Sequence, residues 1–482
     1  MNFRIVTSIL GRILSIEAVL LLAPALCAGL YRENPMPFLW TVLLVLLAAG
    51  MLLLVGRRSV GNLHPREGFV SVTLSWVVIS LFGALPFVFS GAIPSYVDAL
   101  FEIISGFTTT GASILTEIES LPRGVLFWRS FSHWVGGMGV LVFMMAILPT
   151  DDEHSMHLLR AEVPGPVKGK LMPKMRSTAR ALYIIYVVLT LVQVVLLLCG
   201  GMPLYDALVT AFGTAGTGGF AVKNLSIGAY NSAYIDVVTG IFMVLFGVNF
   251  NLYYIALARR SLKGFKSQEL VVYIGVVALS TVTIALNIVH LYGGFPEALR
   301  YSFFQVSSII TTTGYATANF DLWPSFSRTL LVLLMLMGAC AGSTGGGTKV
   351  ARLVIVLKTV WAEIRHQMFP RSVSRVTLDG ERLEDAAVRN TMVFYMLYAF
   401  ILLGASLLLS LQGLDLETTV TSVISCLSNI GPGLSLVGPM GNFSVWCAPA
   451  KLLLALCMLL GRLEIFPVLM LFAPGVWVGQ KK

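Results

Sequence analysis

Four short turns, spaced about a hundred residues apart, each place a glycine among small or hydroxylated residues at the end of an apolar stretch. Backbone carbonyls from four such turns can replace the water around a cation without adding a fixed charge that traps it. Glycine permits the alternating backbone conformations that point successive carbonyls the same way. The sequence therefore predicts a cation filter with one glycine from each turn, Gly111, Gly218, Gly314 and Gly431. The filter segments are Thr109-Thr110-Gly111-Ala112, Gly216-Thr217-Gly218-Gly219, Thr312-Thr313-Gly314-Tyr315 and Asn429-Ile430-Gly431-Pro432.

The number of these turns decides between two interpretations. Small residues also let helices pack closely in a membrane, and a single turn rich in Thr and Gly fits that role equally well. Four copies in phase favour the filter.

A second glycine-rich run interrupts a later apolar segment. Gly345-Gly346-Gly347 should break a helix, and the run does not match a phosphate-binding loop because Thr348 separates Gly347 from Lys349. We interpret it as a flexible gate just below the filter; a kink for close packing is the alternative. The candidate gate residues are Gly342, Ser343, Thr344, Gly345, Gly346, Gly347, Thr348, Lys349 and Arg462.

Charged residues inside apolar runs are costly and usually functional. Arg462 and Glu464 lie deep in the last run, where they either pair with each other or Arg462 reaches the filter or the gate. Lys349 has the further interpretation that its ammonium group extends to the cytoplasmic interface. His133 and Trp134 are interpreted as anchors at the outer interface.

The composition is that of a membrane protein. Of the 482 residues, 56% are hydrophobic and 12% charged, and the mean hydropathy is +0.84, whereas soluble domains carry about 25% charged residues. The net charge of +9 does not indicate nucleic-acid binding, because the basic residues gather in alternate loops and mark these as cytoplasmic. The filter turns then face outward, and both termini are expected in the cytoplasm. The basic residues are Arg57, Arg58, Arg160, Lys168, Lys170, Lys174, Arg176, Arg180, Arg259, Arg260, Lys263, Lys266, Lys349, Arg352, Lys358, Arg365, Arg371, Arg375, Lys481 and Lys482.

The chain divides into a leading hairpin and four repeats of one plan. Each repeat has a span, an apolar segment too short to cross a bilayer, a glycine turn and an inward span. The predicted fold is an all-α polytopic membrane protein with ten transmembrane helices and four re-entrant half-helices around one central pore. The predicted units are 1–62 for the N-terminal hairpin and 63–165, 166–265, 266–380 (with the gate) and 381–482 for the pore repeats.

Together, the four turns, the Gly345-Gly346-Gly347 break and the Gly461-Arg462-Leu463-Glu464 run resemble the TrkH/TrkG branch of the Trk/Ktr/HKT superfamily of potassium transporters. The resemblance covers essentially the whole chain. It implies potassium uptake across the bacterial cytoplasmic (inner) membrane by a homodimer in which each subunit has its own pore. It also implies a cytosolic nucleotide-binding RCK subunit of the TrkA type that opens the gate. K+ is then the transported ion and membrane lipid the surroundings, with no organic cofactor on this chain.

Other functions stay open at this point. The second and fourth turns lack the Thr-Thr-Gly of the first and third, so the asymmetry also fits a less selective K+/Na+ pathway. A K+/H+ or K+/Na+ symporter would need an ionisable coupling residue in the pathway. An enzyme is not expected, because no nucleophile–base pair or metal-ligand set lies on neighbouring spans.

Overall fold

The structure is a computed structural model that describes residues 1–57, 65–139, 175–259, 262–371 and 375–477. The expected unit boundaries at 62/63 and 165/166 lie outside these ranges. So do several of the basic residues that mark the expected cytoplasmic loops, namely Arg58, Arg160, Lys168, Lys170, Lys174, Arg260, Lys481 and Lys482.

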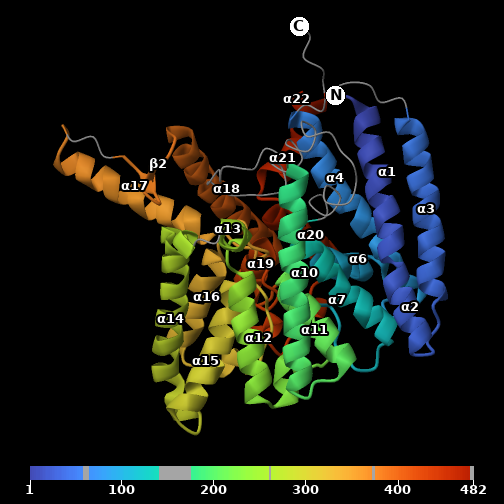
Figure 1. Cartoon of the computed structure of the whole chain (residues 1–482), viewed down its shortest axis with the longest axis horizontal. Coiled ribbons are helices and arrows are strands. Elements are labelled where there is room, and N and C mark those ends of the chain that lie inside the picture. Colours follow the sequence, from blue (N-terminus) through green and yellow to red (C-terminus); the bar gives the residue numbers. More distant parts are fainter. Residues whose placement is uncertain (58–64, 140–174, 260–261, 372–374, 478–482) are drawn as a thin grey trace.

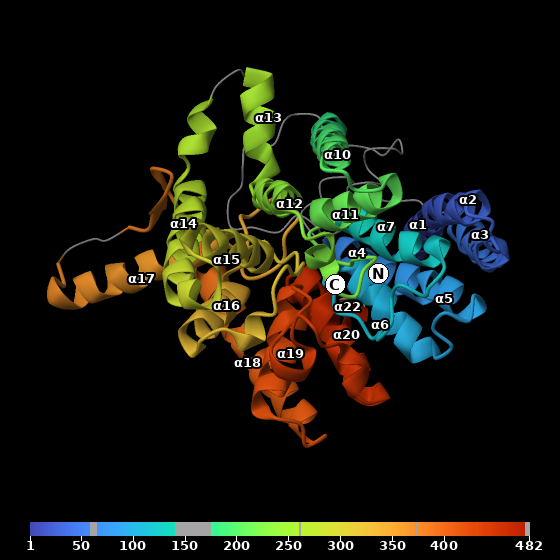
Figure 2. The same cartoon turned by 90° about the horizontal axis from the view of Figure 1, so that it is seen from below.

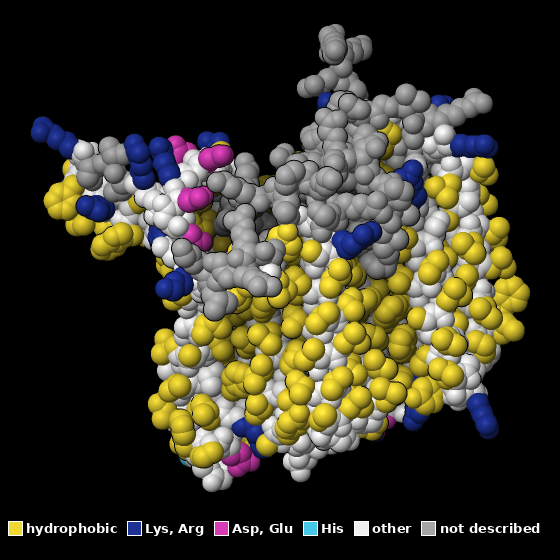
Figure 3. All heavy atoms as spheres, in the orientation of Figure 1, with side chains coloured by type: hydrophobic (Ala, Val, Ile, Leu, Met, Phe, Trp, Pro, Cys, Tyr) yellow, Lys and Arg dark blue, Asp and Glu magenta, His cyan; other side chains and the backbone are white. Residues whose placement is uncertain are grey.

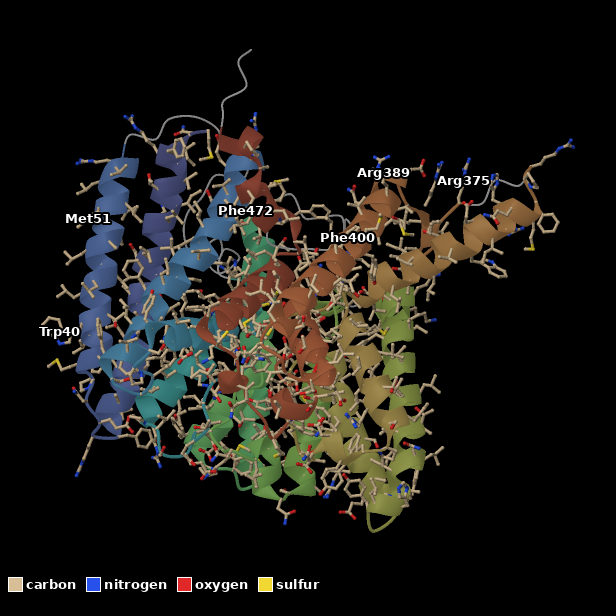
Figure 4. The ribbon with its side chains drawn as sticks, turned by 180° about the vertical axis from the view of Figure 1, so that it is seen from behind. Trp40, Met51, Arg375, Arg389, Phe400 and Phe472 are labelled. Atoms are coloured by element: carbon tan, nitrogen blue, oxygen red, sulfur yellow. The ribbon has the colours of Figure 1, made fainter. Side chains whose placement is uncertain are left out.

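The leading hairpin is present as predicted. It consists of α1 (Phe3–Leu20), α2 (Leu22–Leu30) and α3 (Met36–Gly56). α1 and α3 pack closely enough that a Cβ on Gly56 would lie 2.8 Å from the Cβ of Ser8. On the opposite face of α3, Trp40 and Met51 point away from the body (Figure 4) and are 58% and 66% exposed. A helix with large apolar side chains on its exposed face suits a lipid-facing position.

Four successive groups of helices follow one plan, and their bounds are as follows. The first contains α4 (Pro65–Gly83), α5 (Leu85–Phe89), α6 (Tyr96–Phe107) and α7 (Arg123–Gly137). The second contains α10 (Met175–Cys199), α11 (Leu204–Gly216), α12 (Ala233–Phe246) and α13 (Phe250–Arg259). The third contains α14 (Gln268–Ile288), α15 (Phe295–Ile310), α16 (Ser325–Met337) and α17 (Val350–Met368). The fourth contains α18 (Asp385–Ser410), α19 (Leu416–Ser428), α20 (Ala448–Arg462), α21 (Phe466–Phe472) and α22 (Pro474–Trp477).

The remaining elements are short. The strands β1 (Thr377–Leu378) and β2 (Glu381–Arg382) pair antiparallel between the third and fourth groups. α17 extends away from the body beside them (Figure 1). Short 3-10 helices are η1 (Ser226–Tyr230), η2 (Leu262–Lys266), η3 (Val289–Leu291), η4 (Phe320–Leu322), η5 (Ser435–Val437) and η6 (Phe443–Val445).

Several helices are long and apolar enough to cross a membrane. Among the described residues there are six such segments, and α12 with α13, bent by 86°, would make a seventh. Hydrophobic side chains form a broad band over the face seen in Figure 3. The helices that follow the glycine turns in the other repeats, α7, α16 and α20, have only 15, 13 and 15 residues. At about 1.5 Å per residue, this length falls short of a hydrocarbon core about 30 Å thick. The count of ten spans therefore stays a prediction.

The helix that directly precedes the glycine turn in each repeat, here called the pore helix, is the element that positions the turn. The four pore helices α6, α11, α15 and α19 surround one centre (Figure 2). Local sequence starts them: Ser95 and Asp415 cap α6 and α19 through their side chains, while Pro203 and Pro296 stand at the starts of α11 and α15. Each pore helix ends in one of the four glycine turns.

Polar contacts join each repeat to the next. Each contact links the start of the helix that follows one glycine turn to the start of the pore helix in the following repeat. In three of the four junctions the contact is an ion pair, and in the fourth it is a hydrogen bond. The Lys451–Asp98 pair links residues 353 positions apart and joins the fourth repeat back to the first. The four contacts are Asp236 Oδ2–Arg300 Nε (3.6 Å), Arg328–Glu417, Lys451 Nζ–Asp98 Oδ1 (2.6 Å) and Tyr205 Oη donating to the Arg123 carbonyl (2.7 Å).

Lys451→Met is expected to lower the free energy of unfolding by about 1–3 kcal/mol, because Asp98 then lacks its partner in a half-buried site. Adding Asp98→Asn should restore part of this loss, since no unpaired charge remains. Thermal unfolding in detergent measures both. The matched control is Lys223→Met, whose pair with Glu119 is 39% and 45% exposed and should cost under about 1 kcal/mol. Equal losses in the two lysine variants would contradict the account.

Candidate functional site

Each pore helix ends in the same hydrogen-bonded turn. The residue two positions before the turn's glycine has the left-handed backbone conformation. The N–H of the residue that follows it donates to the carbonyl five residues earlier in the helix, which is the Schellman pattern of a helix C-terminus. The left-handed residues are Thr109, Thr217, Thr312 and Asn429, with φ between 56° and 60°. The bonds are Thr110 N to Ser105 O (2.9 Å), Gly218 N to Gly213 O (2.8 Å), Thr313 N to Ser308 O (2.8 Å) and Ile430 N to Ser425 O (2.9 Å).

The turn is followed by a glycine that lies against a backbone carbonyl of another repeat. A Cβ added at any of the four glycines would come closer to that oxygen than 3.0 Å, a separation that real Cβ atoms essentially never show. Because the last of these contacts returns to the first repeat, the four turns form one closed ring. The distances from the added Cβ are 1.9 Å for Gly111 to Gly218 O, 2.0 Å for Gly219 to Thr313 O, 2.1 Å for Gly314 to Ile430 O and 2.9 Å for Gly431 to Thr110 O.

These contacts correct the register of the second turn. The expected filter glycine there was Gly218, but Gly219 has the positive φ (75°) and the close approach that match the other three glycines. Gly218 instead occupies the position of Thr110, Thr313 and Ile430. The cause is the helix end: α11 continues to Gly216, so the left-handed residue is Thr217 and the glycine two positions later completes the turn.

The glycines of all four turns open into one cavity. It has a volume of about 150 Å³, and Gly111, Gly219, Gly314 and Gly431 line it together with segments that follow each turn. The threonine and asparagine side chains of the turns lie on the protein side and are fully buried. We call this cavity the vestibule. It reaches the ring from the side on which the pore helices begin.

Hydroxyl groups support the first and third turns in the same way. The Thr108 and Thr110 hydroxyls lie 2.8 Å apart, as do those of Thr311 and Thr313. In the fourth turn the Asn429 amide donates to the Thr110 hydroxyl at 3.0 Å, which ties the fourth turn to the first. The two Thr-Thr-Gly turns thus share this hydroxyl pair, which the residues of the second and fourth turns do not provide.

The glycine-rich loop, residues 338–349, lies at the C-terminal ends of two pore helices. Gly346 N donates to Thr312 Oγ1 at 2.6 Å, and Gly347 N donates to the Ser428 carbonyl at 2.8 Å. A Cβ on Gly346 would lie 2.4 Å from that same Ser428 oxygen. The loop is therefore packed against the third and fourth turns on the side opposite the vestibule, and glycine is needed for the approach.

Arg462 joins this loop to the first repeat. Its guanidinium donates to the Thr344 carbonyl at 2.9 Å and to the carbonyls of Gly136 and Gly137 at the end of α7. The two interpretations of Arg462 were a pair with Glu464 and a contact with the filter or the gate. In the structure Arg462 contacts the glycine-rich loop. Glu464 pairs with Arg352 instead.

Lys349 lies inside the protein rather than at the cytoplasmic interface. Its side chain is 4% exposed, and its ammonium group donates to the Gly345 carbonyl within the loop. The interfacial interpretation was wrong because the loop folds back toward the pore-helix ends. Ser343 and Thr348 close the loop locally, donating to the Cys340 and Leu336 carbonyls, while Gly342 O accepts from Phe250 N at 3.0 Å.

Comparison with known proteins identifies the family. The model of the TrkH family, described as a cation transport protein, matches residues 38–477. The chain belongs to the TrkH family. It is 37% identical to the Trk system potassium uptake protein TrkH of Salmonella typhimurium, over 99% of this chain and 100% of that protein. It is 32% identical to the TrkG of Escherichia coli, over 99% of each. The crystal structure of the potassium transporter TrkH from Vibrio parahaemolyticus matches with a TM-score of 0.90 at 34% identity, covering 99% of this chain and 100% of that one.

The sequence analysis did not predict the buried side chains of this TrkH-family protein that pack against the first and second glycine turns. His133 was expected at the outer interface but is fully buried against the second turn. Trp134, the other expected anchor, stacks on Tyr186 with the ring centroids 5.5 Å apart. Glu102 and Arg129 form a buried ion pair (2.5 Å) beside the first turn. An available signal was the presence of a carboxylate inside an apolar segment, with Arg129 and His133 one helical turn apart.

Glu269 was also missed, although it holds both ends of the glycine-rich loop. Its carboxylate accepts from Ala341 N at 2.6 Å and from Ala351 N at 3.3 Å. The sequence gives no local signal for this, because Glu269 stands at the start of α14, where an acidic residue normally serves the helix dipole.

Gly314→Ala is expected to destabilise the protein by at least about 1–2 kcal/mol, because φ is +83° and alanine pays that much in the left-handed region. The displaced Ile430 carbonyl adds to the loss. The control is Gly404→Ala in α18, where nothing lies within 4 Å of the added Cβ and helix propensity predicts a gain of about 0.5–1 kcal/mol. Thermal unfolding of the two purified variants makes the comparison. A Gly314→Ala protein as stable as wild type would refute the close approach.

Proposed function

We propose that this chain takes up K+ across the cytoplasmic (inner) membrane through the ring of four glycine turns. The observation that carries the proposal is the closed series of glycine–carbonyl contacts that links all four repeats and opens into one vestibule. Backbone carbonyls suit a large monovalent cation, because they replace its hydration shell without binding it irreversibly. The printed names of the relatives, potassium uptake proteins, agree with this choice of ion.

The pore helices supply the electrostatic preference for a cation. Each of the four directs its C-terminal end toward the ring, and this end carries about half a negative charge from the helix dipole. The ion-coordinating atoms in this proposal are the backbone oxygens of the four segments, Thr109 to Ala112, Gly216 to Gly219 with Phe220, Thr312 to Tyr315 and Asn429 to Pro432. Whether Na+ is rejected depends on how rigidly the two irregular turns are held.

The proposed gate is the glycine-rich loop. It lies in line with the ring on the side away from the vestibule. Gly346 and Gly347 bond it to the ends of two pore helices, and Arg462 bonds it to the end of α7. Losing the Arg462 contact would release Thr344 from the end of α7. We infer that conduction requires this loop to move aside.

Control of the loop is assigned to a partner. The relatives are named as members of a Trk system, and we propose a cytosolic nucleotide-binding RCK subunit that acts on a homodimer of this chain. The exposed basic side chains Arg375 and Arg389, at the end of the molecule where α17 and α18 meet (Figure 4), are suited to an acidic partner surface. Both termini lie on this cytoplasmic side in the proposal.

Purified wild-type chain in proteoliposomes is expected to carry K+ down its gradient with no pH or Na+ gradient imposed. The physical reason is that carbonyl coordination needs no co-transported ion. Flux of 86Rb+ or K+ into vesicles, with protonophore present to abolish a proton gradient, is the measurement. Flux that requires an imposed H+ or Na+ gradient would instead establish a symporter.

Arg462→Gln is expected to raise basal K+ flux roughly tenfold, because a charge-assisted hydrogen bond holding the loop contributes about 1.5–3 kcal/mol. Deleting Gly345-Gly346-Gly347 should also raise it. The control is Arg382→Gln, an exposed arginine on β2 that should leave flux unchanged. If Arg462→Gln folds and its flux is unchanged or lower, the loop is not a gate held by this residue.

A further inference from the structure

The second filter turn lacks the internal support that two of the other turns have. Six residues before the filter glycine, the third and fourth pore helices carry a serine whose hydroxyl donates to the turn: Ser308 to Tyr315 O and Ser425 to Gly431 O, both at 2.6 Å. The equivalent residue in the second pore helix is Gly213, which has no side chain to donate. With three glycines in Gly216-Thr217-Gly218-Gly219, this turn is the least constrained by its own sequence.

The third repeat supplies the missing hydroxyl. Tyr315, which directly follows the filter glycine of its own turn, places its hydroxyl 3.3 Å from the Phe220 carbonyl and 3.1 Å from the Thr210 carbonyl. It fits there because a Cβ on Gly213 would lie 2.2 Å from the tyrosine oxygen. The glycine that removes the serine thus makes room for the replacement.

The first repeat binds the N–H of Phe220, the residue whose carbonyl Tyr315 contacts. His133 Nδ1 lies 2.8 Å from the Gly106 carbonyl, which can only accept, so this nitrogen carries the hydrogen. The lone pair on Nε2 then accepts from Phe220 N at 3.3 Å. A Cβ on Gly218 would lie 2.3 Å from the imidazole ring, so the histidine occupies the space that this glycine leaves.

Arg129, one helical turn before His133, completes the support. Its guanidinium stacks over the Phe220 ring at 3.6 Å and donates to the Ala221 carbonyl at 3.1 Å, while Glu102 neutralises it at 2.5 Å. Both backbone polar groups and the ring of Phe220 are therefore held by side chains of the adjacent repeats. The second turn takes its position from its neighbours.

We propose that His133 and Tyr315 are positioning residues that set the discrimination of K+ from Na+ by fixing the second turn within the filter ring. The inference rests on the proposed K+ pathway. In the account of selectivity based on cavity size, which this inference adopts, a filter rejects the smaller ion because its oxygens stay at the spacing suited to the larger one. Loosening one of four turns lets that ring contract, so Na+ entry rises while the pathway stays open.

The first test compares two tyrosine variants that each lose only a hydroxyl. Tyr315→Phe is expected to lower the ratio of K+ to Na+ flux in proteoliposomes about fivefold, the factor associated with one lost hydrogen bond. The control is Tyr96→Phe, whose hydroxyl donates to the Leu81 carbonyl at 2.9 Å in an exposed site, and it should keep the wild-type ratio. Equal ratios in the two folded variants would overturn the proposal.

The second test uses His133 and covers the case in which Tyr315→Phe does not fold. His133→Gln keeps an oxygen that can accept from Phe220 N, whereas His133→Met has similar length and no such acceptor. The glutamine variant is expected to retain more of the K+ to Na+ ratio than the methionine variant. The same ratio in both, with thermal stability equally reduced, would mean that His133 only fills space. Absence of K+ flux in wild type would instead reject the proposed function itself.

Discussion

The carbonyl of one repeat lies where the side chain of the preceding repeat's glycine would be, and this close approach constrains much of the molecule. It occurs four times and returns to its start, so the four repeats must meet at one level and in one order. Only glycine satisfies it, because both the positive φ and the missing Cβ are required. The pore helices then have to deliver their C-terminal ends to a common centre, and the polar contacts between repeats keep those helices at fixed spacing.

The same ring explains the surroundings of the glycine-rich loop. The inward helices stop at corresponding places, at Gly137, Phe246, Met337 and Arg462, so the space beneath the ring is lined by helix ends with unpaired backbone groups. Arg462 binds two carbonyls at the end of α7 and the Thr344 carbonyl of the glycine-rich loop, and the loop in turn binds the Ser428 carbonyl at the end of the pore helix α19. A charged residue at this depth is tolerated because its hydrogen-bonding groups are matched by helix ends.

The sequence was sufficient for those features that depend on local pattern. Hydropathy and length predicted the leading hairpin and the short apolar segment before each glycine turn. The position of the glycine turns followed because helix breaks at membrane depth are rare. The register of the second turn did not follow, since Gly216, Gly218 and Gly219 are equally able to take a positive φ and only the end of α11 decides among them.

Contacts between distant segments were beyond local reasoning. His133 reads as an interfacial residue until the second pore helix is brought beside it, and Lys349 reads as a flexible surface lysine until the loop folds inward. The role of Gly213 is visible only when Tyr315, 102 positions later in the sequence, occupies its space. These residues are specified by how the four repeats interlock, a property of the assembled ring.

The most direct test of the account is to locate the ion. Crystals of the wild-type chain grown or soaked in rubidium, measured at the rubidium absorption edge, should show anomalous density on the axis of the ring formed by the carbonyls of Thr110, Gly218, Thr313 and Ile430. Density confined to sites outside this ring, or none within it at saturating rubidium, would contradict the claim that the four turns form one cation filter.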